Sequence, residues 1–345
     1  MFSSRKLKFR SFLLAALLPA AFVAPTSYAA TMATGSFENI VAAAKQEGSL
    51  TYYTVLTPDQ AGRLGTAFQK KYGIKLNVVR GTTGTLTQRY SSELAANNVV
   101  ADVLTISSIK YYEDGESKGT FKKFSSSYLP NLSQWPAAAF TDNIVTRIAL
   151  NPFVIAYNTD LVKKEDIPKK WSDILSPKFQ NRLGAPRFTV NTAYEELLYF
   201  WYQKFGVGFL HKFKAQNPKY YDSSSPGNQA LAAGEFAIYA PSMPHFVQPL
   251  IDKGAPINQV FLDLTTGDPD LAAISAKAPH PNAAAVFMNF LLSREGQEII
   301  NKKVGMSFLK DIPGSLKPPG KFELPDVEGT ASHLSVILRE VGVHN

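Results

Sequence analysis

Two periodic patterns of apolar and polar residues alternate along the chain. Short runs rich in apolar and β-branched residues at 50–55, 74–79 and 101–108 are typical of buried strands. Between them, apolar residues recur at helical spacing over 57–73 and 86–96. Strands that alternate with helices in this way predict a mostly parallel sheet wrapped by helices, which is an α/β fold.

Residues 277–302 carry the clearest helical signal. A Pro-His-Pro-Asn turn leads into a segment whose apolar residues keep helical spacing as far as Leu291. Ser293 can cap a second, shorter helix. We expect both helices to flank the sheet and bury one face each.

The polar stretch 109–135 predicts the first crossing from one lobe to another. The second lobe should then contain a strand pair near 143–158 and further strand-helix units as far as about 271. The predicted division places a signal peptide at 1–29, the first lobe at 30–108 and 272–325, the second lobe at 109–271, and a C-terminal segment of undetermined lobe at 326–345.

The N-terminus has the form of a secretory signal. Four basic residues precede an uncharged apolar run at 12–24 and a small-x-small site that ends at Ala29. The run of 13 residues falls short of the roughly 20 that a membrane-spanning helix needs. We therefore expect cleavage after Ala29 and a periplasmic location.

Charge and cysteine content exclude several kinds of partner and site. Removing the signal lowers the formal net charge from +8 to +4, and the remaining lysines and arginines are scattered, so nucleic acid is not an expected partner. The absence of cysteine excludes disulfides, thiolate metal sites and cysteine nucleophiles.

Four phrases in the sequence resemble bacterial extracellular solute-binding proteins, the periplasmic receptors of ABC importers, in the branch with ferric-ion, thiamine and phosphonate binders. They occur in the family's order: Ala-Asp-Val at 101–103, Tyr-Asn-Thr at 157–159 with Pro168, Trp171, Asp173 and Pro177 downstream, Ala-Leu-Ala-Ala-Gly-Glu-Phe at 230–236, and the segment 277–302. The resemblance implies a two-lobe periplasmic-binding fold of type II, a monomer that holds one small ligand in a cleft without a cofactor, and a membrane permease as partner.

Ligands of open α/β sheets bind where strands end and helices begin. In this chain those places are rich in hydroxyl groups and small residues. The predicted ligand-binding residues are Tyr53, Thr54, Thr57, Gly81, Thr82, Thr83, Ser107, Ser108, Arg187, Thr189, Asn191, Thr192, Tyr239, Ser242 and His245. The Gly-Thr-Thr-Gly loop can equally be an ordinary turn, and Arg187 a surface cation.

An oxyanion such as a phosphonate, phosphate ester or carboxylate suits these donors best. Ferric ion is the alternative, but it prefers several anionic oxygens, and the predicted loops contain no acid. The chain also lacks the histidine after the first strand and the tyrosine pair after the Gly-Glu strand that ferric-ion receptors of this family show. No metal site is therefore expected.

Sequence motifs of hydrolases and nucleotide-binding enzymes are missing. A catalytic group assembled in space, for example from Ser242, His245 and Asp263, remains a remote alternative. We therefore expect a binding protein and not an enzyme.

Overall fold

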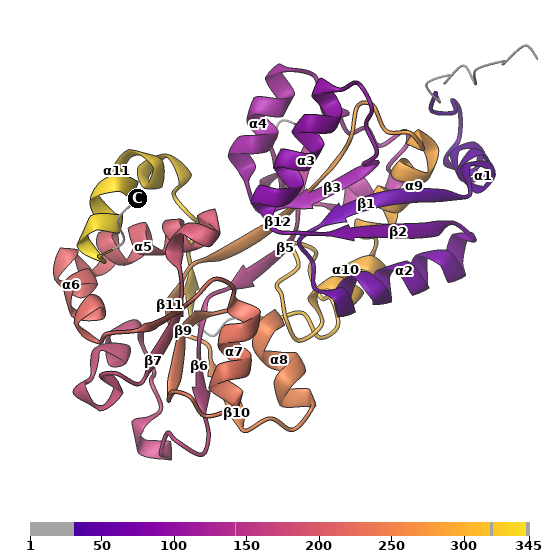
Figure 1. The fold of residues 1–345 in the computed structure, drawn as a ribbon. Helices are drawn as coiled ribbons and strands as arrows, with labels where there is room; N and C mark the ends of the chain where they lie inside the picture. The colour runs from indigo at the N-terminus through magenta and orange to yellow at the C-terminus, as the bar shows by residue number, and fades with distance from the viewer. Residues whose placement is uncertain (1–30, 142, 318–319, 343–345) are drawn as a thin grey trace, which may run out of the picture.

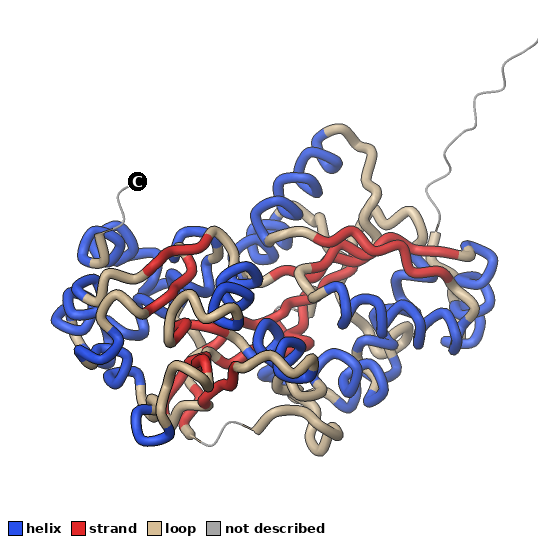
Figure 2. Tube along the Cα trace, turned by 60° about the horizontal axis from the view of Figure 1, so that its bottom comes forward, coloured by secondary structure: helices blue, strands red, loops and turns tan. Residues whose placement is uncertain are grey.

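The computed structural model describes residues 31–141, 143–317 and 320–342, which form two lobes (Figure 1). Each lobe has one main sheet with helices around it (Figure 2). The α/β fold and the two-lobe architecture predicted from the sequence are thereby confirmed. No helix of the described residues is both long and apolar enough to span a bilayer. The predicted signal peptide lies outside the described residues.

The first lobe is built on a six-stranded mixed sheet of order β2-β1-β3-β12-β5-β4. Parallel pairing joins β1 to β2 and β3, whereas β12 runs antiparallel to both β3 and β5. Its strands are β1 (Ser49–Thr54), β2 (Lys75–Arg80), β3 (Val103–Ile106), β4 (Phe140–Thr141), β5 (Val145–Pro152) and β12 (Gly267–Ile274). Its helices are α1 (Phe37–Glu47), α2 (Pro58–Tyr72), α3 (Thr83–Ala95), α4 (Ile109–Ser117), α9 (Pro281–Leu291) and α10 (Arg294–Asn301).

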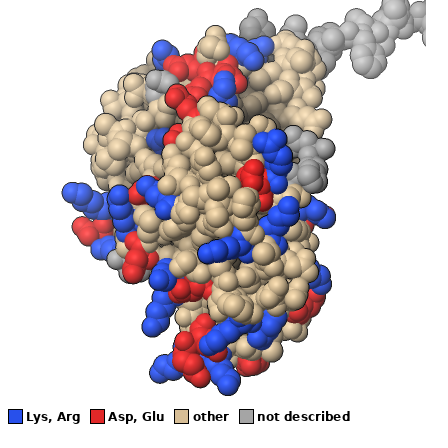
Figure 3. All heavy atoms as spheres, turned by 90° about the vertical axis from the view of Figure 1, so that its left-hand side faces the viewer, with Lys and Arg blue, Asp and Glu red and all other residues tan. Residues whose placement is uncertain are grey.

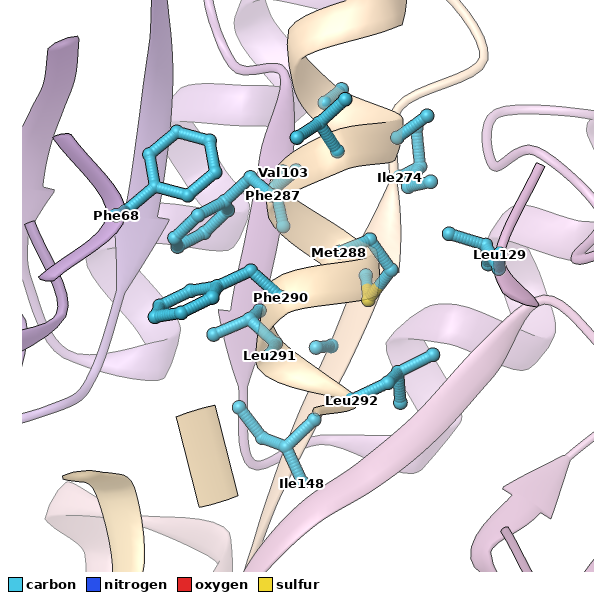
Figure 4. Close-up of a cluster of buried hydrophobic side chains, with 14 of the residues drawn as sticks. Phe68, Val103, Leu129, Ile148, Ile274, Phe287, Met288, Phe290, Leu291 and Leu292 are labelled. Atoms are coloured by element: carbon cyan, nitrogen blue, oxygen red, sulfur yellow. The ribbon is translucent and has the colours of Figure 1, made fainter. Parts of the chain in front are cut away.

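Helix α9 forms the centre of the first lobe's core, as Figure 4 shows. Every one of its residues is buried. The Phe287 ring meets Tyr52 edge-on at a centroid distance of 4.8 Å and Phe68 at 5.1 Å. The sequence predicted one buried face for this helix, but α9 packs against the sheet and also against α1, α10 and the turn at Pro130–Gln134. Ser293 caps α10 as predicted, accepting a hydrogen bond from the Gly296 amide at 3.1 Å.

Helix α2 begins where the sequence predicts. The Thr57 hydroxyl accepts from the Gln60 amide at 3.3 Å, and the Gln60 side-chain oxygen accepts from the Thr57 amide at 3.0 Å. This reciprocal pair satisfies two backbone donors that have no partner within the helix. Thr57 thereby positions the helix that follows the first strand.

The chain first crosses between the lobes at Pro152 and Phe153, where β5 leads into β6 (Val154–Asn158). The expected crossing at 109–135 is wrong, because this stretch contains α4 and the sheet of the first lobe continues through β5. The Tyr112 hydroxyl of α4 donates to the carbonyls of Leu104 and Leu271 at 2.8 and 2.9 Å, which ties α4 to that sheet. Polar composition misled the prediction, since Tyr112 and Gly115 are the only buried residues of α4.

The second lobe contains a five-stranded sheet of order β10-β6-β9-β7-β8. Its remaining strands are β7 (Leu183–Pro186), β8 (Lys219–Tyr221), β9 (Ile238–Ser242) and β10 (Ile257–Val260). Its helices are α5 (Thr192–Phe205), α6 (Val207–Ala215), α7 (Ser224–Ala232) and α8 (Pro244–Asp252). Short 3₁₀ turns occur in both lobes at Pro130–Gln134, Ala137–Ala139, Lys164–Asp166, Trp171–Leu175, Pro177–Phe179 and Phe188–Val190. Aromatic rings dominate the core of this lobe, with Trp171 and Trp201 packed edge-on at 5.1 Å.

The C-terminal segment belongs to the second lobe. A two-stranded ribbon of β11 (Leu264–Thr265) and β13 (Lys321–Phe322) brings the chain back from the first lobe. Helix α11 (Val327–Glu340) then packs on α5 and α6, with Ile337 and Leu338 in the second core. Its lobe, left open by the sequence, is therefore fixed by burial of an apolar face.

Truncating the central ring of α9 should strongly destabilise the protein. Phe287→Ala removes a fully buried ring and is expected to lower the free energy of unfolding by about 3–5 kcal/mol. Phe205→Ala is the matched control, because this side chain is 38% exposed and should cost much less. Urea unfolding of both variants checks the prediction. Equal losses would show that α9 does not organise the core.

Candidate ligand-binding cleft

A cleft of about 130 Å³ lies between the lobes where the crossing strand β12 begins. Both lobes contribute to its wall. The lining residues are Val55, Leu56, Gln60, Arg80, Gly81, Thr82, Thr83, Ser107, Val190, Asn191, Tyr194, Asp222, Ser223, Ser224, Met243, His245, Phe246, Asp268 and Asp270. A second hollow of about 430 Å³ shares Gln60 and His245 with it and extends towards α8 and α10.

Helices from both lobes begin at this cleft. Thr82 caps α3, accepting from the Thr85 amide at 3.3 Å, and the Thr83 hydroxyl accepts from the Ser107 amide at 3.2 Å. On the other side, Ser223 stands at the N-cap of α7, and its side chain makes no capping bond there. The first amide groups of a helix have no partner within it and carry partial positive charge. The cleft is therefore bordered by hydrogen-bond donors suited to an anion.

Arg80 is the only lysine or arginine among the described lining residues. Its Nε donates to the Leu56 carbonyl at 3.0 Å, a bond that fixes the guanidinium beside the loop that starts α3. Nearby, burial and the charge of Arg80 lower the pKa of His245 to about 3. The imidazole is therefore neutral at physiological pH, and Arg80 is the fixed positive charge of the wall.

Two buried carboxylates, Asp268 and Asp270, lie at the floor of the cleft on β12. Asn191 donates to Asp268 at 3.2 Å, and Asn151 donates to Asp270 at 3.0 Å. Burial and, second, the charge of Asp270 raise the pKa of Asp268 to about 7, while burial raises the pKa of Asp270 to about 6. The predicted loops contain no acid, but the cleft does, because β12 contributes these two aspartates.

Six predicted site residues line the cleft: Gly81, Thr82, Thr83, Ser107, Asn191 and His245. They come from strand ends and helix caps, where the prediction placed them. Gly81 has a steric reason to be glycine, since a Cβ there would lie 2.6 Å from the Thr85 hydroxyl. A Cβ at Gly84 would meet only open space.

Four other predicted residues are buried away from the cleft. The Tyr53 hydroxyl donates to Glu93 at 2.5 Å, and Thr54 accepts from the Leu56 amide at 3.1 Å. Tyr239 packs in the second lobe, and the Ser242 hydroxyl donates to Asn228 at 3.0 Å. Side chains alternate across a strand, so residues close to a strand end can face the core and not the ligand.

Five further predicted residues are also absent from the lining of this cleft. Thr57 and Ser108 cap α2 and α4, and Thr57 borders the second hollow. Thr189 and Thr192 are exposed. Arg187 pairs with Asp222, its Nε 2.5 Å from the Asp222 Oδ1, and its side chain is 58% exposed.

The prediction also missed lining residues, most notably Arg80, Ser223, Asp268 and Asp270. The two aspartates alternate with Pro269 in an otherwise apolar run that is buried throughout. Burying an aspartate in a strand costs free energy, so two aspartates in a buried run indicate a specific role. This pattern was the signal available in the sequence. Arg80 is the last residue of the edge strand β2, and in the sequence it cannot be distinguished from a surface cation.

The model of the family described as bacterial extracellular solute-binding proteins matches residues 44–298. The chain belongs to this family. The resemblance identified from the four sequence phrases is thereby confirmed, and with it the role of a solute-binding component of an ABC transporter. No curated protein sequence matches the chain.

Solved structures agree on the fold. Iron-bound HitA from Pseudomonas aeruginosa is 22% identical, with a TM-score of 0.69, and the match covers 86% of this chain and 99% of HitA. AfuA from Actinobacillus pleuropneumoniae, solved with fructose-6-phosphate, is 19% identical with a TM-score of 0.70 and coverages of 86% and 100%. An ABC-transporter substrate-binding protein from Agrobacterium tumefaciens is 16% identical with a TM-score of 0.74 and coverages of 85% and 94%. At these identities the likeness shows the fold and not the ligand.

The stability of the ligand-free protein should depend on pH through the Asp268 carboxyl group. Its raised pKa means that the folded state binds the proton more tightly than the unfolded chain. The stability that this gives is present below about pH 4, the ordinary value for an aspartate, and is lost as the pH rises to about 7.

We expect Asp268→Asn to gain melting temperature relative to wild type as the pH rises from 4 to 7. Asp252→Asn is the control, because Gln248 and Lys303 lower the pKa of Asp252 and the trend there should be weak and opposite. Thermal melts at several pH values measure both differences. A wild-type minus Asp268→Asn difference that does not change with pH would contradict the assignment.

Proposed function

We propose that this chain is exported to the periplasm, captures a small solute with an oxyanion group in the cleft, and delivers it to the permease of an ABC importer. It would act as a monomeric receptor without a cofactor and without catalysis. The oxyanion class of the ligand is inferred from one observation: helices from both lobes, α3 and α7, begin at the cleft that Arg80 also lines. The sequence supports export through its predicted signal peptide.

Donors of three kinds support an oxyanion in this place. The starts of α3 and α7 offer amide groups, Thr82 and Ser223 offer hydroxyl groups, and Arg80 offers a charge-assisted bond. Helix N-termini favour negative charge, each by roughly 0.3–1 kcal/mol. A phosphate, phosphonate, sulfonate or carboxylate group can satisfy several of these donors at once.

The outer end of the second lobe gives no support to a polyanionic partner such as nucleic acid. Basic and acidic side chains are interspersed over the outer end of the second lobe, the face seen in Figure 3. A receptor for nucleic acid would be expected to gather its lysines and arginines in one stripe.

Ferric-ion capture, the alternative from the sequence, has less support. The described residues hold no group of three histidine, cysteine, aspartate or glutamate side chains able to share a metal ion. Two of the similar structures, HitA and the Trichodesmium protein FutA, were solved with iron, so iron belongs among the ligands to be tested.

Arg80, and not Arg187, should control oxyanion affinity. Arg80→Gln removes a charge-assisted contact of roughly 1.5–3 kcal/mol, so the dissociation constant for 2-hydroxyethyl phosphate should rise about ten- to a hundredfold. Arg187→Gln is the matched control, because Arg187 is exposed, pairs with Asp222 and does not itself line the cleft. Isothermal calorimetry on both variants decides between them. A loss confined to Arg187→Gln would reverse the assignment.

A further inference from the structure

The floor of the cleft contains an acceptor without a donor. Asp268 is 5% exposed, and its Oδ1 has no hydrogen-bond partner among the described residues. Its other oxygen, Oδ2, accepts from Asn191 at 3.2 Å. A buried acceptor left unpaired costs free energy, so a ligand that donates a hydrogen bond to Oδ1 would be stabilised there.

Negative charge at the floor is not neutralised by the protein. In the described part of the chain, no lysine, arginine or histidine forms an ion pair with Asp268 or Asp270. Arg80 is bonded to the Leu56 carbonyl.

Two places in the cleft therefore favour ligand groups of opposite charge. The helix starts and Arg80 favour an anion, whereas Asp268 and Asp270 favour a cation or a strong donor. An oxyanion alone would leave the negative charge of the two carboxylates without a counter-ion. A hydroxyl group would give Asp268 Oδ1 a donor without neutralising that charge. A protonated amine does both, because it presents three donors and a full positive charge.

We propose that the ligand is zwitterionic: an ammonium group bound at Asp268 and Asp270, joined by a short linker to the oxyanion at the helix starts. This inference rests on the proposed function and names the chemical class of its solute. The cleft of about 130 Å³ suits a compact molecule, such as an aminoalkyl phosphate or an amine-bearing acid of similar size.

A matched pair of probes tests the inference. The compounds 2-aminoethyl phosphate and 2-hydroxyethyl phosphate share the same oxyanion and differ only in the ammonium or hydroxyl group at the other end. Calorimetry at pH 7.5 should show the amine binding at least about tenfold tighter, as expected for a buried charge-assisted pair. Asp268→Asn should reduce this preference to less than about threefold, while Asp114→Asn, an exposed change on α4, should leave it intact.

The outcomes separate this inference from the proposed function. Equal affinity for the two probes, or a preference for the alcohol, overturns the ammonium site and leaves oxyanion capture standing. Ethanolamine binding as tightly as its phosphate ester would overturn oxyanion capture and support the ammonium site. A preference for the amine that persists in Asp268→Asn and in Asp270→Asn, with both variants folded by thermal melt, would place the ammonium elsewhere and overturn the assignment.

Discussion

The antiparallel pair β5 and β12 is the constraint on which the two-lobe structure depends. These strands connect the lobes, and their backbones approach so closely that a Cβ at Gly267 would lie 2.2 Å from the Asn151 carbonyl oxygen. Asn151 fixes the pair further, donating to the Asp268 carbonyl at 3.2 Å and to the Asp270 carboxylate at 3.0 Å. The same strand that joins the lobes therefore carries the acids at the floor of the cleft.

Placing acids on a connecting strand has consequences for binding. A ligand that bonds Asp268 contacts a segment shared by both lobes, whereas the starts of α3 and α7 belong to one lobe each. The ligand-free cleft holds carboxylates whose raised pKa values reflect the cost of burying charge. A ligand that supplies the missing donors offsets this cost, so part of its affinity derives from relieving an unfavourable feature of the empty receptor.

Local sequence signals predicted the fold well because they are determined by short-range physics. The capping pair of Thr57 and Gln60 and the cap at Ser293 both formed as expected. The boundary between the lobes was not predictable in this way, since α4 has the polar composition of a loop and joins the first lobe only through buried contacts such as those of Tyr112. Half-buried helices and connecting segments differ in tertiary contacts more than in composition.

Site residues were harder to predict, because direction matters as much as position. Tyr53 and Tyr239 stand near strand ends but point into the cores, while Arg80 at the end of an edge strand reaches the cleft. A prediction based on loop residues alone therefore found the hydrogen-bond donors at the start of α3. It missed the aspartates of β12, which lie within a strand.

Native mass spectrometry of the protein released from the periplasm without denaturation tests the central claim most directly. The account predicts one bound small molecule of discrete mass that contains an oxyanion group, identified after extraction, and that is diminished in Arg80→Gln. A ferric ion as the bound species, or a cleft that retains only neutral compounds, would contradict it.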